Sequence, residues 1–414
     1  WLGKKKGKEA YIVPTVVGGH VEYSIGHDPK RAPTKQDDGT ISGRRGAVCI
    51  SCHSAISMDY IKNEGNHGLM GVQVCAVVAE GRRSRIYLSP SDAIVESARI
   101  EWPTRVPSQK LPNDPRNFWT VAYGLDTFDK LFTARQLTAL TTFSDLVSEA
   151  RERVLRDALA GGMSEGERLE AGGVGAAAYA DAVAVLLSFS IDRMANRMSS
   201  ICSWDCSSKM EAVRSVFARQ ALPMTWDFAE ANPFAGSSGD FLKEVVRVVD
   251  GVRSLPTEKC GTAIQVDAAS RMCDGFVIST DPPYYDNIGY SDLSDFFYVW
   301  LRRSLKDIHP SLFSTMLVPK AEELVANQYR HGGKDGARDF FEDGFRAVFA
   351  NARRSTNPDY PMTVYYAFKQ SETNVDGRTS TGWSTILEGM IRSGWSITAT
   401  WPMRSERRGR MTSI

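Results

Sequence analysis

Hydrophobic and polar positions divide the chain into three regions with different periods. Residues 1–105 carry short apolar runs between polar turns, as in "AYIVPTVV" and "VEYSI", which is typical of β-strands. Residues 106–225 begin with a proline-rich loop and continue with the 3.6-residue spacing of helices. In residues 226–414 helical and strand patterns alternate, which is typical of a doubly wound α/β sheet. We therefore predict a β-rich region, a helical region and an α/β region.

Local patterns in the first two regions place individual elements. The apolar runs on both sides of a glycine-containing turn in "GVQVCAVVAEGRRSRIYLSP" predict a β-hairpin. The stretch "TARQLTALTTFSDLVSEARERVLRDAL" predicts a long helix whose first turn is a capping box of Thr133 and Gln136. A second, more apolar and therefore more buried helix is predicted in "AAAYADAVAVLLSFSIDRMANRM", and a third around "KMEAVRSVFARQAL".

The third region is predicted to alternate between helices and strands. The expected helices are "FLKEVVRVVDGVRSL", "SDLSDFFYVWLRRSL", "ARDFFEDGFRAVFANARRS" and "GWSTILEGMIRSG". The expected strands are "TAIQV", "GFVIST", "MTVYYAF" and "WSITATWP".

Bulk composition is that of an ordinary globular chain. Of 414 residues, 42% are hydrophobic and 24% charged, and the net charge of +1 does not indicate a polyelectrolyte partner. We expect the basic runs "KKKGK", "GRRSR" and "RSERRGR" to be solvated surface rather than phosphate-binding tracks. No run of about 18 apolar residues is present, so we expect no membrane partner. Because the chain begins with Trp1 and ends at "RMTSI", we expect it to be part of a longer protein.

One short motif carries candidate chemistry. The apolar pattern "GFVIST" runs directly into Asp-Pro-Pro-Tyr at residues 281–284. Pro282 and Pro283 end the strand, because proline lacks the amide donor of a sheet and fixes the backbone. Asp281 and Tyr284 are therefore expected on a stiff segment at the carboxyl end of a strand, where open α/β sheets bind ligands. The alternative is a tight turn that only ends the strand.

This arrangement suits methylation of an exocyclic amine. The lone pair of adenine N6 is delocalised into the ring, and hydrogen bonds to Asp281 and to the Pro282 carbonyl would direct it toward the methyl group of S-adenosyl-L-methionine. Tyr284 would stack on the base after the base leaves the duplex. Three further residues are candidates to contact the base or its backbone, with ordinary loop polarity as an equal alternative: Tyr285, Asn287 and Tyr290.

Several stretches together resemble a known family, the adenine-specific DNA methylases that contain a zinc ribbon, many of them in phage-defence or restriction-like gene clusters. The resembling stretches are "WLGKKKGKEAYIVPTV", "CISCHSAISMDYI", "VAYGLDTFDKLFTARQLTALTTFSD", "SSICSWDCS", "FARQALPMTWDFAEANPFAGSSGDF", "TDPPYYDNIGYSDLSDFFYVWLRRSL" and "GWSTILEGMIRSGWSITATWPMRSE". The resemblance implies an incomplete Rossmann-like methyltransferase sheet, with a zinc-ribbon-like region at 1–105, a helical insertion at 106–225 and the catalytic portion at 226–414.

The resemblance also implies the activity and its partners. Asp281, Pro282, Pro283 and Tyr284 would form the catalytic tetrad of an S-adenosyl-L-methionine-dependent DNA adenine-N6 methyltransferase. An aspartate rather than a serine at the first position favours adenine N6 over cytosine N4. The expected partners are double-stranded DNA and helicase or nuclease proteins of defence systems, and we expect a cytoplasmic location.

Cofactor contacts are expected near the same strand. In amino-methyltransferases a strand that ends in Asp-Ala precedes the catalytic strand and contacts the cofactor adenine, and "TAIQVDA" places Asp267 there. The alternative is a helix N-cap, and both roles can coexist. Thr280 and Asp281 complete the expected cofactor contacts.

The chain departs from the family in its glycine-rich loop. The family carries a loop of the form DPFxGxG before the zinc ribbon, and the matching position would lie before Trp1, the first residue of this sequence. "NPFAGSSG", residues 232–239, resembles such a loop as a nest of amides before a helix. However, "MTWDFAEA" is a poor buried strand, so we expect 232–239 not to be the cofactor loop. The helical region and the ribbon would then be an insertion that suits target recognition.

Two cysteines form half of a possible zinc site. Cys49 and Cys52 have the CxxC spacing with which two thiolates reach one ion from a tight turn. The family's other knuckle lies before the first residue of this chain, and His53 and Cys75 are conceivable substitutes. The remaining cysteines are expected to be packed thiols: Cys202, Cys206, Cys260 and Cys273.

Two other functions remain open from the sequence. A related enzyme could methylate RNA or a protein glutamine amide with the same Asp-Pro-Pro-Tyr segment, residues 281–284, which is called the elbow below. Alternatively, the chain could be a zinc-knuckle nucleic-acid-binding piece without catalysis, because the glycine-rich loop is missing. Methylation and cofactor-binding assays separate the three.

Overall fold

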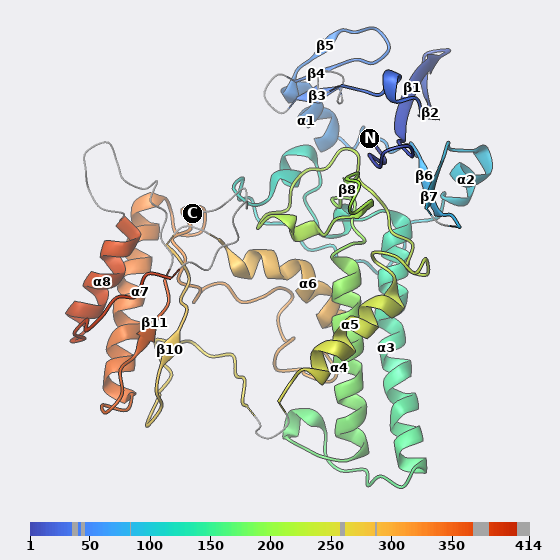
Figure 1. Cartoon of the computed structure of the whole chain (residues 1–414). Coiled ribbons are helices and arrows are strands. Elements are labelled where there is room, and N and C mark those ends of the chain that lie inside the picture. The colour runs from blue at the N-terminus through green and yellow to red at the C-terminus, as the bar shows by residue number, and fades with distance from the viewer. Residues whose placement is uncertain are drawn as a thin grey trace. The chain divides into compact units, whose positions relative to one another are not determined.

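The computed structural model describes residues 1–34, 40–42, 46–82, 84–256, 261–285, 288–366 and 381–403 (Figure 1). The chain forms two compact units. The first unit comprises Trp1–Leu255 and Leu293–Val318, and the second comprises Pro256–Asp292 and Pro319–Ile414. The three-region division of the sequence stays a prediction beside this finding.

The first 105 residues contain short antiparallel strands. The strands are β1 (Tyr11–Val17), β2 (His20–Gly26), β3 (Ile41–Ser42), β4 (Gly46–Val48), β5 (Ala55–Ile56), β6 (Val77–Glu80) and β7 (Arg85–Leu88). β1 pairs with β2 across Gly18 and Gly19, both of which have positive φ, as a two-residue hairpin turn requires. β6 pairs with β7, so the predicted hairpin is confirmed. β3, β4 and β5 form a three-stranded sheet. Two helices lie between these strands or follow them: α1 (Met58–Asn66) and α2 (Asp92–Ser97).

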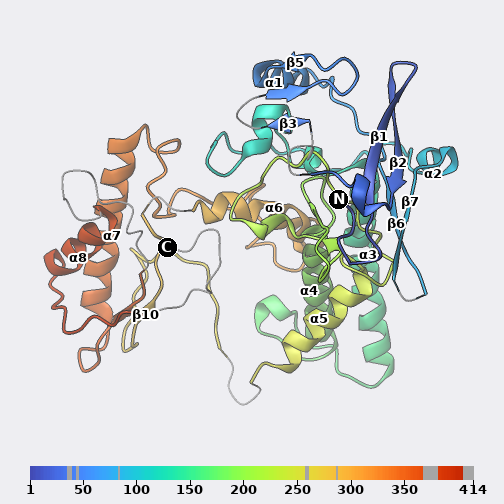
Figure 2. The same cartoon turned by 45° about the horizontal axis from the view of Figure 1, so that its top comes forward.

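Long helices form the centre of the first unit. α3 (Ala134–Ala160) and α4 (Ala176–Ala195) run side by side in both views of the chain (Figures 1 and 2). Thr133 and Gln136 form the predicted capping box, with Thr133 N–H donating to Gln136 Oε1 at 2.9 Å. The contact surfaces of both helices are fully buried, with leucines on α3 and alanines on α4 that allow close approach: Leu137, Leu140, Ala180 and Ala184.

Buried carboxylates hold this helical layer together. Asp181 of α4 is fully buried and accepts hydrogen bonds from Arg151 of α3 and from Arg168, each at 2.6 Å. In α5 (Phe241–Arg253), Glu244 is equally buried and bonds Arg193 of α4 at 2.9 Å. Because each charge is paired where water is excluded, removing one partner would leave an uncompensated buried charge.

The third helix predicted for the helical region is wrong. Residues 209–222 contain β9 (Ala212–Val213), which pairs with β8 (Trp204–Asp205), and a single 3₁₀ turn. Glu211 has φ 42°, which an α-helix excludes. The pairing is fixed by Arg214, which donates to Asp205 at 2.8 Å. Tertiary pairing thus overrides a helical pattern that is only 14 residues long. The described 3₁₀ turns are Pro29–Arg31, Trp119–Tyr123, Asp129–Leu131, Leu169–Ala171 and Val216–Ala218.

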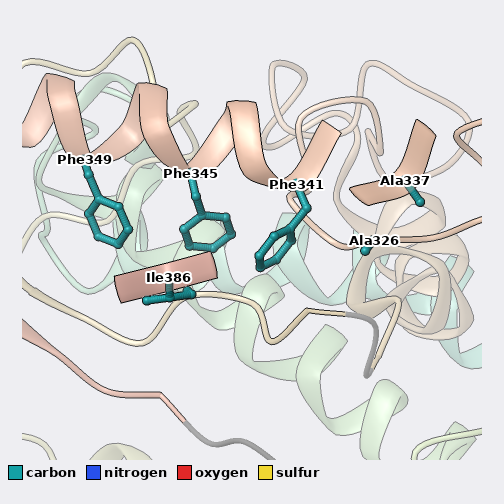
Figure 3. Close-up of a cluster of buried hydrophobic side chains, with 6 residues drawn as sticks. All are labelled: Ala326, Ala337, Phe341, Phe345, Phe349 and Ile386. Atoms are coloured by element: carbon teal, nitrogen blue, oxygen red, sulfur yellow. The ribbon is translucent and has the colours of Figure 1, made fainter. Parts of the chain in front are cut away.

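The second unit contains the parallel strands. β10 (Ser279–Thr280) pairs in parallel with β11 (Thr363–Val364). α7 (Lys334–Ser355) and α8 (Thr381–Arg392) pack through the aromatic side chains of one face of α7, which point toward Ile386 of α8 (Figure 3). The core residues of this contact are Phe341, Phe345, Phe349 and Ile386, each at most 2% exposed. α6 (Tyr290–Leu305) begins in the second unit and belongs to the first from Leu293 onward.

Two predicted strands of this unit are absent from the structure. Residues 262–266 ("TAIQV") and 395–402 ("WSITATWP") form no strand. Ile264 and Val266 are 58% and 49% exposed, and a strand needs a hydrogen-bonding neighbour and a covered apolar face. The parallel β10–β11 pair is consistent with an open α/β sheet, and the complete Rossmann-like sheet stays a prediction.

Every helix in the described part of the chain is too short or too polar to cross a bilayer.

Candidate active site

Asp281 lies at the carboxyl end of β10, as the sequence predicts. Thr363 N–H donates to the Ile278 carbonyl at 3.0 Å, and Tyr365 N–H donates to the Thr280 carbonyl at 2.8 Å. These bonds hold the strand up to the residue before Asp281, where the prolines end it. The Asp281 side chain is exposed, so its carboxylate can be reached from solvent.

Two tyrosines lie beside this carboxylate. The Tyr284 hydroxyl donates to Asp281 Oδ1 at 3.0 Å. Burial, followed by the bond and charge of Asp281, raises the pKa of Tyr284 to about 12, so the phenol is neutral at physiological pH. Burial and then the Asp281 charge also raise the pKa of Tyr290. Asp281, Tyr284 and Tyr290 therefore form one corner, called here the Asp281 corner.

The aromatic side of the corner extends beyond the motif. Tyr366, two residues after β11, packs edge-on against Tyr284 with ring centroids 5.1 Å apart. Tyr366 also stacks on Trp383 of α8, with centroids 6.1 Å apart. Its hydroxyl accepts the Tyr285 N–H at 3.2 Å. The aromatic surface of Tyr284, Tyr366 and Trp383 therefore comes from three separate segments of the second unit.

Tyr285 anchors the backbone of the elbow and does not point outward. Its ring packs edge-on against Phe341 of α7, 5.0 Å between centroids, and its carbonyl accepts the Ala326 N–H at 2.7 Å. This packing supports a positioning role for Tyr285, and its predicted base contact stays a prediction. A further predicted base contact, Asn287, lies outside the described residues.

A charge network holds the first turn of α6, where Tyr290 lies. Ser291 N–H donates to Glu323 Oε1 at 2.8 Å, so a distant carboxylate caps the helix start. Arg330 bonds both Glu323 at 3.0 Å and Asp292 at 2.7 Å. Burial raises the pKa of Asp292 in spite of the Arg330 charge. The network fixes the direction in which the chain leaves the Asp281 corner.

Asp267 lies in a turn and not at a strand end. Its Oδ1 accepts the Ala269 N–H at 3.0 Å, and its carbonyl accepts from Ser270 and Arg271. Asn351 of α7 fixes this turn by donating to the Ala268 carbonyl at 3.2 Å. Among the described contacts, no hydrogen bond or ion pair joins Asp267 to the Asp281 corner. Asp267 therefore caps a turn and not a helix, because no helix of the described residues begins there, and its cofactor contact stays a prediction.

The segment 232–239 is already capped by a carboxylate. Asp240 accepts hydrogen bonds from Gly236 N–H at 2.7 Å and from Lys243 N–H at 3.0 Å, which makes it the N-cap of α5. A side-chain anion therefore occupies the amides that a phosphate or carboxylate ligand would need. This geometry agrees with the expectation that 232–239 is not the cofactor loop.

Cys49 and Cys52 lie in the turn between β4 and β5. Cys49 N–H donates to the Ser54 carbonyl at 2.9 Å, and His53 N–H donates to the Cys49 carbonyl at 2.9 Å. Hydrogen bonds from Ser54 and then Cys49 lower the pKa of Cys52. Two thiols in a tight turn fit half of a tetrahedral zinc site. Within the described residues, no group of three or more metal-binding side chains is present.

Within the residues that the structure describes, neither His53 nor Cys75 joins Cys49 and Cys52 in a group of three metal-binding side chains. Burial raises the pKa of Cys75, which lies beside Tyr23. Cys202 is fully buried, as predicted for a packed thiol, and burial raises its pKa to about 12. Cys206 and Cys273 are half-buried, and Cys260 lies outside the described residues.

Sequence reasoning missed Tyr366, Glu323 and Arg330. Tyr366 lies in the predicted strand "MTVYYAF", where alternation alone does not identify which tyrosine faces the elbow. Glu323 and Arg330 lie outside any element, and only the fold brings them to α6. Comparison with protein-family models, with curated proteins and with solved structures found no significant match.

Proposed function

We propose that this chain carries the catalytic corner of an S-adenosyl-L-methionine-dependent DNA adenine-N6 methyltransferase. The observation that carries the proposal is the exposed Asp281 carboxylate at the end of a parallel strand, with the Tyr284 hydroxyl bonded to it at 3.0 Å. Adenine requires such an arrangement. The hydrogens of its amine need a hydrogen-bond acceptor, and its ring needs an aromatic surface on which to stack.

Binding of the base would replace one hydrogen bond by another. The adenine amine donates to Asp281 Oδ1 in place of the Tyr284 hydroxyl, and a second hydrogen bond to the Pro282 carbonyl holds the nitrogen near tetrahedral geometry. The N6 lone pair would then form the new N–C bond as the S–CH3 bond of the sulfonium breaks and S-adenosyl-L-homocysteine leaves. The proton released from N6 would leave through exposed Asp281 to solvent. Because Pro282 and Pro283 stiffen the segment, the acceptor geometry is set before the base arrives.

Tyr284 and Tyr290 would hold the extruded base. Stacking on an aromatic side chain is worth about 1–3 kcal/mol per base, which offsets part of the cost of unstacking it from the duplex. Tyr290 is 48% exposed and lies at the start of α6, whose first turn is fixed by Glu323. A ring in this position can contact the base or the strand that flanks it.

S-adenosyl-L-methionine, when bound, would supply the electrophilic methyl group. Thr280 is half-buried next to Asp281, and the Asp267 carboxylate is exposed in its turn. Both offer hydrogen-bonding groups suited to the ribose and adenine of the cofactor. Zinc, when bound, would be held by Cys49 and Cys52 as a structural ion. Double-stranded DNA and defence-system helicase or nuclease proteins belong to the same proposal as partners.

Substitution of Asp281 tests the proposal directly. Transfer of a radiolabelled methyl group to DNA, RNA and protein substrates is measured for the wild-type protein, Asp281→Ala and Asp274→Ala. Asp274 is an exposed carboxylate seven residues earlier and serves as the matched control. We expect Asp281→Ala to lose at least 100-fold in rate, in line with loss of a positioned catalytic group, while Asp274→Ala stays near wild type. Transfer to DNA by Asp281→Ala at the wild-type rate would contradict the proposal.

A further inference from the structure

A pocket of about 340 Å³ in the first unit has no role in the proposed chemistry. It lies beside the last turns of α6 and the loop of residues 105–109, and this volume is at the lower end of the range of about 300–1,000 Å³ seen for small-molecule sites. Its lining contains four basic side chains and a single carboxylate, Asp145: the basic residues are Arg105, Arg302, Arg303 and Lys306. The pocket therefore carries more positive than negative charge.

Only some of these basic side chains have partners within the fold. Arg303 is bonded to both oxygens of Asp145, each at 2.7 Å, which neutralises its charge. Arg302 donates to the Thr315 carbonyl at 2.9 Å. For Arg105 and Lys306, the described residues provide no ion pair. Cations near a helix C-terminus also offset the helix dipole, but Arg105 lies on a loop, so the dipole does not account for it.

Two lining residues also hold buried polar atoms without partners. Trp300 is 1% exposed, and its indole N–H has no acceptor among the described residues. Likewise, the buried Oε1 of Gln109 has no donor there. A buried polar group without a hydrogen bond costs about 1–3 kcal/mol. Both atoms are closed to solvent, so a ligand in the pocket meets the cations and the apolar side chains of Val106 and Val299 instead.

We propose that this pocket binds a nucleotide. Arg105 and Lys306 would bind the phosphate, and the base would lie against the apolar side chains of Val106 and Val299. The nucleotide is either free or one unit of a nucleic-acid strand, since both present the same phosphate and base.

Charge reversal at the two unpaired cations tests the pocket. Arg105→Glu and Lys306→Glu, singly and together, are compared with Arg156→Glu, an exposed cation of α3 outside the pocket. Binding of adenosine monophosphate is measured by calorimetry, and binding of a fluorescein-labelled single-stranded oligonucleotide by anisotropy over a salt series. The Arg105→Ala, Lys306→Ala double variant replaces the glutamate pair if the latter unfolds.

We expect the double variant to lose at least tenfold in affinity for one of the two probes, and Arg156→Glu to stay near wild type. Loss of affinity for the monophosphate assigns a free nucleotide. Loss for the oligonucleotide alone assigns a strand, with the slope of log affinity against log salt reduced by about 0.7 per phosphate contact. A double variant that binds both probes as Arg156→Glu does overturns the proposal. Asp281→Ala should bind both probes normally, so failure of the pocket and failure of the methyl-transfer proposal are distinguishable.

Discussion

At the scale of single residues, the Asp281 corner places a hydrogen-bond acceptor, the Asp281 carboxylate, beside the ring of Tyr284. The hydroxyl of that ring already donates a hydrogen bond to the carboxylate. Tyr284 therefore has two separable parts, the hydroxyl that bonds Asp281 and the ring that would stack on a base. The hydroxyl must be displaced for an amine to bind, whereas the ring must stay. This distinction gives opposite expectations for two substitutions at one position.

Tyr284→Phe keeps the ring and removes the hydroxyl, and Tyr284→Ala removes both. We expect Tyr284→Phe to change the rate of methyl transfer to DNA by less than tenfold. Tyr284→Ala should lose about 10- to 100-fold, because base stacking is worth about 1–3 kcal/mol. Methyl transfer under single-turnover conditions checks both values. Equal losses in the two variants would contradict a stacking role.

The Cys49 and Cys52 turn makes a prediction about metal content. Cys49→Ser and Cys52→Ser should each lower the zinc bound per protein molecule, because each removes one thiolate from the half-site. Zinc is measured by mass spectrometry of the purified protein, with Cys273→Ser, a half-buried thiol of the other unit, as control. Equal zinc content in all three variants would exclude this turn as a ligand.

At the scale of elements, helices were predicted far better than strands. The capping box at Thr133 and the regular spacing of apolar residues along α3 are local signals. They predict the helix without information on the elements that pack against it. A strand is defined by its partner, and "TAIQV" has the apolar residues of a strand but no partner in the described chain. The helical pattern around residue 212 failed for the related reason that pairing with β8 overrides it.

The buried Asp181 predicts a large and pH-dependent effect on stability. Asp181→Asn should lower the free energy of unfolding by about 3 kcal/mol, because Arg151 and Arg168 lose their counter-charge. Urea denaturation measures it, with Asp157→Asn, an exposed residue 3.8 Å from Arg153, as control. A loss no larger than in the control would show that the network does not stabilise the fold.

The pH dependence of this effect has a definite sign. Burial opposes ionisation of Asp181, but the hydrogen bonds from Arg168 and Arg151 outweigh it and hold its pKa below the ordinary value. The stabilisation is therefore present above the unfolded pKa of about 3.9 and is lost as pH falls through the lower folded pKa. The difference between wild type and Asp181→Asn should shrink over that interval.

At the scale of the whole molecule, the position of the Asp-Pro-Pro-Tyr motif at a strand end could be predicted from the sequence, but its surroundings could not. The prolines at 282 and 283 identify the elbow locally. Tyr366 and Arg330 reach it only because β11 pairs with β10 and because residues 319–331 fold back on the start of α6. Such contacts depend on long-range pairing, which one sequence does not encode in any short pattern. The alternation of helices and strands predicted a doubly wound sheet, but it did not predict which strands pair with each other.

The core of the second unit predicts a contrast between two isoleucines of α8. Ile386 is fully buried against Phe341, Phe345 and Phe349, whereas Ile391 is 58% exposed. Ile386→Ala should cost about 2–5 kcal/mol and Ile391→Ala less than about 1 kcal/mol. Amide hydrogen exchange of α7 and α8 reports on this unit alone. Similar protection in both variants would contradict the packing.

The β10–β11 ladder has a consequence for insertions and deletions far from the motif. Neighbouring side chains of an extended strand point to opposite faces, so a slip of one residue would exchange Tyr365 for Tyr366. With only two paired residues on each strand, little else resists such a slip. A single residue added to the loop at 357–362 would therefore move Tyr366 away from Tyr284 and abolish the proposed methyl transfer, although Asp281, Tyr284 and Tyr290 were unchanged.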